Sequence, residues 1–133
     1  MKSHVIKAKE QILSYGLDGS QIKLLDQISQ KNSITHININ ATDSNQSIGY
    51  LCGFKGFLRA EKQGEILVGK QCLILSGIQR KNIQHILDEI KSSGLNIPLK
   101  AMVTPTNQSW ILSDLISELE REHEYMTNRK AQK

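Results

Sequence analysis

The chain has 133 residues, of which 38% are hydrophobic and 23% are charged, and its formal net charge is +4. This length predicts a single domain with a real core, and the composition argues against wholesale disorder. No apolar run approaches the roughly 20 residues of a membrane span, and the start of the chain lacks the apolar stretch of a signal peptide. Two cysteines, Cys52 and Cys72, supply neither a CxxC pair nor a disulfide framework. We therefore expect a cytoplasmic protein with reduced thiols and no membrane association.

The positive charge belongs to the two ends of the chain. Without the six basic residues nearest the ends, the interior carries 11 basic and 13 acidic residues. The densest interior group of cations is offset by Glu61 and Glu65, whereas a nucleic-acid footprint is a clustered basic stripe on the folded domain. Nucleic acid is therefore not the expected partner, although an RNA-associating protein that uses its basic ends is the alternative function. The end residues are Lys2, Lys7, Lys9, Arg129, Lys130 and Lys133, and the interior group is Lys55, Arg59, Lys62 and Lys70.

The two halves of the chain show the same order of predicted elements. Each begins with an apolar strand, which is followed by a helix with apolar residues at helical spacing, a strand of alternating residues and a second helix. Asn32-Ser33 and Ser93-Gly94 are the predicted stops of the first helix in each half. The predicted elements are a strand at Gln11–Leu17, a helix around Ile22–Ile28, a strand at Ile37–Ala41, a short helix near Gln46–Phe54, a strand at Cys72–Ile78, a helix around Ile83–Ile90, a strand at Leu99–Val103 and a long helix near Trp110–Met126.

The halves repeat at a spacing of 61 to 62 residues. At an offset of 61, Val5–Glu10 lies over Ile66–Gln71, and one extra residue in the second half then moves the offset to 62. Thr42–Ser47 therefore lies over Thr104–Ser109, and the tripeptide Asn-Gln-Ser recurs in register. We interpret the chain as an internal duplication within one domain. Its parts are a first repeat over residues 5–54, an exposed linker over 55–65, a second repeat over 66–126 and a basic tail over 127–133.

The strand patterns predict an α/β protein with one four-stranded sheet built from two βαβα halves. The first strand of each half is continuously apolar and is expected in the centre of the sheet, while the alternating second strands have one buried face. This pattern favours a two-layer, ferredoxin-like split βαβ sheet in which the halves interlock about a pseudo-twofold axis. A small doubly wound parallel sheet is the alternative, because the two closing helices also need a surface to cover.

The paired loops around Asn-Gln-Ser are the candidate ligand-binding site. Each loop is predicted to follow a strand and to open a helix, where free backbone N–H groups and the helix dipole favour an anion or a carboxylate. The competing interpretation is that these residues only cap the helices, and in an interlocked sheet the two loops could lie far apart. The candidate residues are Asn45, Gln46, Ser47, Thr104, Asn107, Gln108, Ser109 and Trp110.

The other chemically interesting residues have structural explanations. Trp110 could stack on a ring, although a tryptophan at a helix start usually belongs to the core. His123 and its neighbouring glutamates lack the further ligands of a metal site, and neither His36 nor His85 has a Ser, Cys or Asp at a readable spacing. Cys52 is predicted to be a buried thiol rather than a nucleophile. We therefore expect no catalytic residue, no metal and no cofactor.

One segment of the second half resembles a known family. Ile97–Asn107, Trp110 and Glu118–His123 resemble an uncharacterised bacterial family of short proteins that share a domain of unknown function, and Gln46–Leu51 is similar to its pattern. Ile111 stands where a threonine is expected to open a capping box, so the last helix is expected to take its cap from Ser109 or Thr106. The resemblance implies a small bacterial cytosolic protein and supplies no activity.

Taken together, these features predict a non-enzymatic regulatory module. It would bind a small ligand or an anion and would self-associate as a homodimer through an exposed sheet face or edge. An enzyme of unidentified class ranks below both this function and the RNA-associating alternative.

Overall fold

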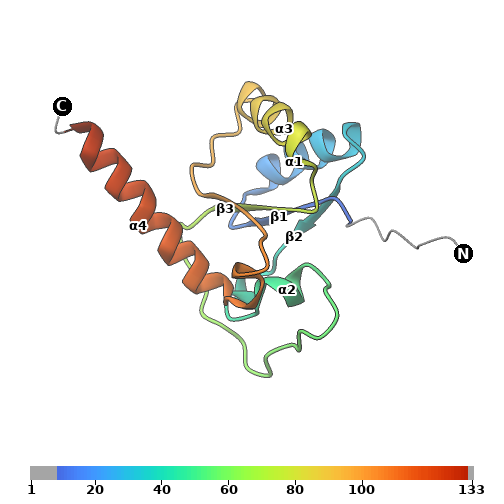
Figure 1. Ribbon diagram of the computed structural model, residues 1–133, viewed down its shortest axis with the longest axis vertical. Helices are drawn as coiled ribbons and strands as arrows, with labels where there is room; N and C mark the ends of the chain where they lie inside the picture. Colours follow the sequence, from blue (N-terminus) through green and yellow to red (C-terminus); the bar gives the residue numbers. More distant parts are fainter. Residues whose placement is uncertain (1–8, 132–133) are drawn as a thin grey trace, which may run out of the picture.

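The computed structural model describes residues 9–131, and its elements follow the same order in both halves (Figure 1). The first half contains β1 (Gln11–Tyr15), α1 (Gly19–Lys31), β2 (Thr35–Asn38), the 3-10 helix η1 (Ala41–Asp43) and α2 (Ile48–Leu51). The second half contains β3 (Cys72–Ser76), α3 (Arg80–Ser92), β4 (Lys100–Met102), the 3-10 helix η2 (Asn107–Ser109) and α4 (Leu112–Ala131). This repeated order is what the duplication hypothesis requires. The start of the first repeat at residue 5 and the basic residues Lys2, Lys7 and Lys133 lie outside the described residues.

The four strands form one mixed sheet in the order β2-β1-β3-β4. Within each half the two strands are parallel, and the halves meet through the antiparallel pair β1 and β3, in which Leu13 lies opposite Ile74. The mixed α/β class and the central position of the first strands are confirmed. The ferredoxin-like order is wrong, because each second strand pairs with the first strand of its own half. The alternative of a fully parallel sheet is also wrong, because β1 and β3 are antiparallel. Alternation along a strand reports which face is buried but not which strand lies beside it, so both orders fitted the sequence.

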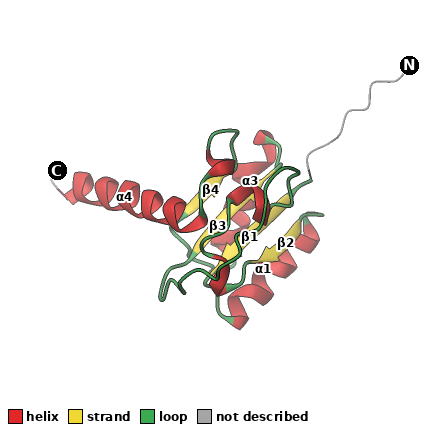
Figure 2. Ribbon diagram, turned by 90° about the horizontal axis from the view of Figure 1, so that it is seen from below, coloured by secondary structure: helices red, strands yellow, loops and turns green. Residues whose placement is uncertain are grey.

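Helices cover both faces of the sheet, which gives three layers in place of the predicted two (Figure 2). On one face, residues of α1 and α3 pack with Ile12, Leu73 and Leu75. On the other face, Ile48 of α2 and the start of α4 pack with residues of β1 and β3. Successive residues of a strand point to opposite faces, so the fully buried strands β1 and β3 supply both cores. The closing helices therefore occupy the second face, as the doubly wound alternative required.

The first helix of each half ends where local chemistry dictates, and α1 also begins at a side-chain cap. Asp18 accepts a hydrogen bond from the backbone N–H of Gln21, whose side chain bonds back to the Asp18 N–H in a capping box. At the other end, Ser33 has φ of 58° and Gly94 has φ of 91°, the left-handed conformation that terminates a helix. Both predicted stops are confirmed.

α4 is longer than predicted and leaves the body of the domain (Figure 1). It continues five residues beyond the predicted end at Met126, so the predicted basic tail begins inside the helix. Its first turns bury Leu112, Leu115 and Ile116, whereas every side chain over residues 121–128 is exposed. No helix in the range that the structure describes combines the length and the apolar character needed to cross a membrane.

The linker over residues 55–65 is anchored, although most of its side chains are exposed as predicted. The Gly64 N–H donates to the Thr42 carbonyl at 2.7 Å, and the Ser44 hydroxyl donates to the Glu65 carbonyl at 2.5 Å. Phe57 packs so closely on α2 that a Cβ atom at Gly49 would lie 2.6 Å from its ring. The linker is therefore a docked part of the first half.

Replacing Gly49 with alanine tests the docking of the linker. We expect Gly49→Ala to destabilise the protein by about 1–3 kcal/mol, because the added methyl group overlaps the Phe57 ring. Urea unfolding measures the stability, and limited proteolysis should show faster cleavage within residues 55–65. Gly19→Ala is the matched control, since a Cβ atom there meets nothing within 4 Å. Unchanged stability and unchanged cleavage of Gly49→Ala would show that Phe57 does not anchor the linker.

Candidate functional site

The two candidate loops lie side by side over one face of the sheet. The Ile48 N–H donates to the Trp110 carbonyl at 2.9 Å, and the Leu112 N–H donates to the Gln46 carbonyl at 3.0 Å. Ser47 and Ile111 form an antiparallel bridge between the loops. The expectation that the loops could lie far apart is therefore wrong, because each connection runs back over the sheet to the middle of the molecule.

The two copies of Asn-Gln-Ser do not occupy equivalent positions in the fold. In the first loop, Ser47 is the N-cap of α2 and its hydroxyl accepts from the Tyr50 N–H at 3.1 Å. In the second loop, the tripeptide itself forms η2, and α4 begins three residues later at Leu112. The predicted cap of α4 by Ser109 or Thr106 is wrong. Backbone carbonyls of the first loop replace this cap. The Ser113 N–H donates to the Ser44 carbonyl at 2.8 Å, and the Leu112 N–H donates to the Gln46 carbonyl.

Ser47→Ala and Ser109→Ala form a matched pair that tests this difference. We expect Ser47→Ala to lower the free energy of unfolding by about 0.5–2 kcal/mol, because it removes the side-chain cap of α2. Ser109→Ala removes only a 3.4 Å hydrogen bond to the Thr106 carbonyl, so its effect should stay within about 0.5 kcal/mol. Urea unfolding of both variants checks the prediction. Equal losses would mean that the two serines have equivalent roles after all.

In the second loop, Thr104 and Asn107 bind each other. The Thr104 N–H donates to Asn107 Oδ1 at 2.8 Å, and the Asn107 N–H donates to Thr104 Oγ1 at 3.0 Å. Asn107 Nδ2 also donates to the carbonyl of Met102 in the edge strand β4. The Gln108 N–H donates to the backbone carbonyl of Thr104, and the Trp110 N–H donates to that of Asn107. An anion at this loop would have to compete with these bonds, and anion binding stays a prediction.

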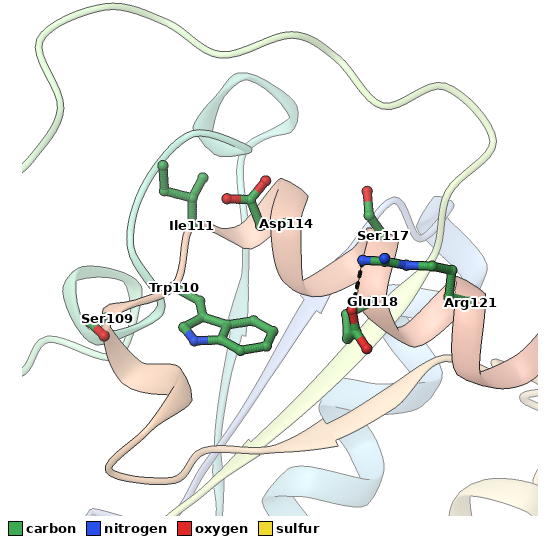
Figure 3. Close-up of a pocket in the computed structure, with 7 residues that line it drawn as sticks. All are labelled: Ser109, Trp110, Ile111, Asp114, Ser117, Glu118 and Arg121. Atoms are coloured by element: carbon green, nitrogen blue, oxygen red, sulfur yellow. Dashed lines mark hydrogen bonds and ion pairs between the residues drawn. The ribbon is translucent and has the colours of Figure 1, made fainter.

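An open groove of about 500 Å³ begins at the second loop and runs along α4 (Figure 3). Trp110 contributes an indole that is 37% exposed, whereas Ile48, its counterpart in the sequence register, is completely buried. Trp110 is therefore a wall of the groove and belongs to neither buried core. The lining residues are Ser109, Trp110, Ile111, Asp114, Ser117, Glu118 and Arg121.

The groove carries more negative than positive charge. Arg121 Nη2 lies 2.7 Å from Glu118 Oε2, so these two side chains largely neutralise each other. The carboxylate of Asp114 is exposed and forms no ion pair among the described residues. One uncompensated carboxylate and an exposed indole that line the same groove are a combination that favours a cation.

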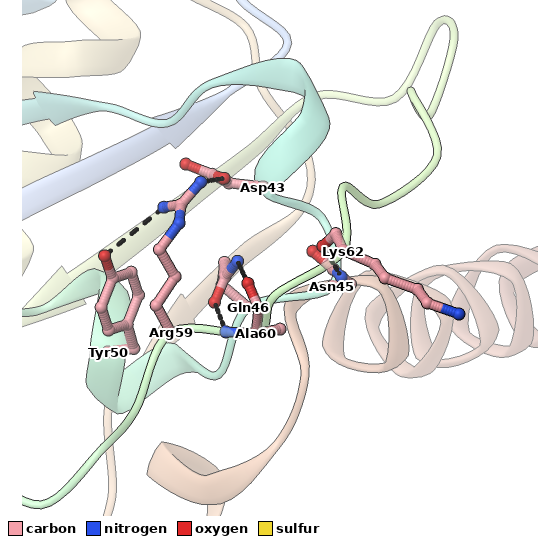
Figure 4. A network of polar contacts seen from close by, with 7 residues as sticks. All are labelled: Asp43, Asn45, Gln46, Tyr50, Arg59, Ala60 and Lys62. Carbon is pink, nitrogen blue, oxygen red and sulfur yellow. Dashed lines mark hydrogen bonds and ion pairs between the residues drawn. The ribbon is translucent and has the colours of Figure 1, made fainter.

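The first loop is covered by the linker, as Figure 4 shows. Gln46 is buried, and its side chain both donates to and accepts from the backbone of Ala60, at 3.2 and 2.7 Å. Asn45 Nδ2 donates to the Lys62 carbonyl at 2.6 Å, while Asn45 Oδ1 is buried without a hydrogen-bond partner. Asn45 and Gln46, two of the three candidate residues of this loop, therefore hold the linker in place.

The interior basic group is divided by ion pairs. Arg59 Nη2 lies 3.2 Å from Asp43 Oδ1, and Lys70 is paired with Glu120. Lys55 and Lys62 are exposed on the linker. This separation does not produce the continuous cationic track that an RNA backbone prefers. The RNA-associating alternative depends on the basic chain ends instead, and it stays a prediction.

The structure brings together a serine, a histidine and an aspartate that sequence reasoning missed. His36 Nδ1 lies 2.5 Å from Asp26 Oδ1, and His36 Nε2 lies 2.7 Å from Ser14 Oγ. Ser14 also donates to Asn38 Oδ1 at 3.3 Å. The three groups follow one another in the order found in serine hydrolases. They come from β1, α1 and β2, so only the parallel pairing of the strands reveals them.

This arrangement has the bonding of a catalytic triad but not its accessibility. Ser14 is completely buried, and the His36 side chain is only 3% exposed. Four grooves on the described surface are lined by other residues. A carbonyl substrate could not approach Ser14 Oγ without opening the α1 side of the sheet, so we interpret the three residues as a buried polar link between α1 and the two strands.

Histidine substitutions test that structural role. We expect His36→Ala to lower the free energy of unfolding by about 1–3 kcal/mol, because it removes a buried group with two hydrogen-bond partners. His85→Ala is the control, since that side chain is 71% exposed, and its effect should stay within about 0.5 kcal/mol. Urea unfolding distinguishes the two. A loss for His36→Ala no larger than the loss for His85→Ala would remove the structural explanation.

Neither thiol is activated, and the described acidic residues do not gather as a metal site. Both thiols are free and buried, and burial raises the pKa of Cys52 and raises that of Cys72 to about 12. The interpretation of Cys52 as a buried thiol is confirmed. Over the residues with a described placement, no three His, Cys, Asp or Glu side chains gather as a metal site would need.

A family model described as a domain of unknown function, DUF3783, matches residues 71–126. The matched segment begins just before β3 and ends within α4, so it includes the second loop and the whole groove. The resemblance found at Ile97–His123 is confirmed, whereas the one at Gln46–Leu51 lies outside the match. No curated protein and no solved structure matches the chain.

Proposed function

We propose that the protein is a non-enzymatic binding module that works as a homodimer, with α4 as the element that joins the two copies. The observation that carries this proposal is the exposed half of α4. Tyr125 is 64% and Met126 52% exposed there, on a helix segment that projects from the body of the domain (Figure 1). An isolated helical segment of this length is marginal in water, so a partner that packs on it would stabilise it.

The inner side of α4 provides the contact surface. A groove of about 220 Å³ separates the exposed half of α4 from the edge of the sheet. Leu119 and Met126 continue the apolar stripe that begins with the buried residues Leu112, Leu115 and Ile116. The lining residues are Pro98, Leu99, Lys100, Leu119, Glu122, His123 and Met126.

A second copy of the chain fits this surface better than another partner. Lys100 stands on the sheet side of the groove and Glu122 on the helix side. In a twofold pair, each groove would receive the α4 of the other copy, and the Lys100 and Glu122 side chains of the two copies would carry complementary charges. The carbonyl of Met102 on edge strand β4 is already bonded by Asn107, which favours side-chain packing over addition of a strand.

Light scattering coupled to size-exclusion chromatography tests self-association. We expect the protein to elute with about twice its 15.0 kDa mass, and Met126→Lys to elute as a monomer, because a buried unpaired ammonium opposes association. Asn128→Lys is the matched control: it adds the same charge to an exposed position of the same helix, two residues further along and turned away from Met126. It should leave the mass unchanged. A monomeric wild-type protein, or dissociation by both variants alike, would overturn the proposal.

The compartment belongs to the same proposal. Two free, buried thiols suit the reducing cytoplasm, and the resemblance in the second half suggests a bacterial cell. Neither feature requires a cofactor or a membrane.

A further inference from the structure

The first half of the molecule shows how an extended segment lies on the connection between a 3-10 helix and the following helix. There the segment is the protein's own linker (Figure 4). Its Arg59 guanidinium is 3.2 Å from the Asp43 carboxylate, and the guanidinium carbon lies 5.9 Å from the centre of the Tyr50 ring. The backbone of Ala60 is held by Gln46. A carboxylate and an aromatic ring thus hold the arginine, while the neighbouring backbone is hydrogen-bonded.

The corresponding connection in the second half is uncovered. In element order, η2 and α4 correspond to η1 and α2, but α4 is a helix of 20 residues that runs away from the domain, where the first half has a linker that turns back (Figure 1). The groove lined by Trp110 and Asp114 opens at this place (Figure 3). It offers the same two kinds of group that hold Arg59 in the first half, an aromatic ring and a carboxylate. The apolar side chain of Ile111, 40% exposed, stands beside them.

The charges around this groove select the sign of the ligand. Residues 112–126 contain five carboxylates and one arginine, and that arginine is already paired with Glu118. Asp114 is left without a cation among the described residues. The surroundings therefore attract a cation and repel an anion.

We propose that the groove binds an extended segment of a partner protein that carries an arginine or lysine next to an apolar side chain. The cation lies in the groove that the Trp110 indole and the Asp114 carboxylate both line, and the apolar side chain lies against Ile111. The linker of a second copy is not available for this role, because it is docked on its own first half. The site is independent of self-association, since Asp114 and Arg121 lie two turns apart on the side of α4 away from Leu112 and Leu119.

Trp110 is the chain's single tryptophan, so its fluorescence reports directly on the groove. The probe is a synthetic peptide with the linker sequence of residues 56–60, Gly-Phe-Leu-Arg-Ala, acetylated and amidated at its ends. Two matched peptides carry Gln or Glu in place of the arginine. We expect the arginine peptide to change the emission saturably, with an affinity that falls as salt is raised. The Gln peptide should bind more weakly, and the Glu peptide most weakly.

Three substitutions at exposed helix positions test whether the groove prefers a cationic ligand. Asp114→Asn should weaken binding of the arginine peptide by about two- to fivefold, because it removes the free carboxylate. Arg121→Gln should strengthen it by about the same factor, because it releases Glu118 from its ion pair. Asp88→Asn, on the exposed face of α3, is the control and should leave the affinity unchanged. Thermal melting confirms that each variant is folded.

The outcomes separate this site from the dimer and from an anion site. Binding by Met126→Lys equal to that of the wild type is expected, whereas loss of binding in that variant alone would overturn the independence of the two surfaces. Tighter binding of the Glu peptide, with the signs of Asp114→Asn and Arg121→Gln reversed, would replace the cationic ligand with a carboxylate. Equal binding of all three peptides, or no change in Trp110 emission with any of them, would overturn the proposal.

Discussion

The antiparallel pairing of β1 with β3 is the constraint on which the rest of the molecule depends. Both strands are fully buried, so the pair has two apolar faces, and each face must be covered by helices. Because the pair is antiparallel, the strands of the first half and those of the second half have their carboxyl ends at opposite ends of the sheet. Each half therefore sends its second connection back over the shared face, and the two connections meet there through the Ser47–Ile111 bridge. The candidate loops are neighbours because the central strands run in opposite directions.

The local pattern of the sequence predicted the elements well but not their partners. The strands at Gln11 and Cys72 and the helix stops at Ser33 and Gly94 follow from apolar runs and from residues that tolerate the left-handed conformation, which are properties of a few adjacent residues. The strand order and the third layer depend on which buried surfaces fit together across the chain, and a periodic pattern does not contain that information. The docking of the linker was missed for the same reason, since the contact of Gly49 with Phe57 depends on the folded backbone.

In the candidate site, too, the local features could be predicted from the sequence, whereas the contacts between distant residues could not. The capping role of Ser47 could be predicted, because a cap is formed by residues three positions apart. The recurrence of Asn-Gln-Ser suggested equivalent loops, but α4 starts later relative to its tripeptide, so the second copy became η2 instead of a cap. The link between Ser14, Asp26 and His36 could not be predicted, since residues 10 to 22 positions apart meet only through the β1–β2 pairing. A serine in the middle of a mostly apolar strand was the one local signal.

The two halves differ in their last helix, and this difference explains why the η2–α4 connection is exposed while the η1–α2 connection is covered. In the first half α2 has four residues, and the linker that follows it turns back and covers the η1–α2 connection with its own arginine and backbone. In the second half the chain continues into a helix of 20 residues, so the equivalent connection keeps an exposed indole and carboxylate. The first half holds an extended segment at this surface, and for that reason we propose the exposed surface of the second half as the place for a partner. The family model matches this second half, the part of the chain in which that surface is open.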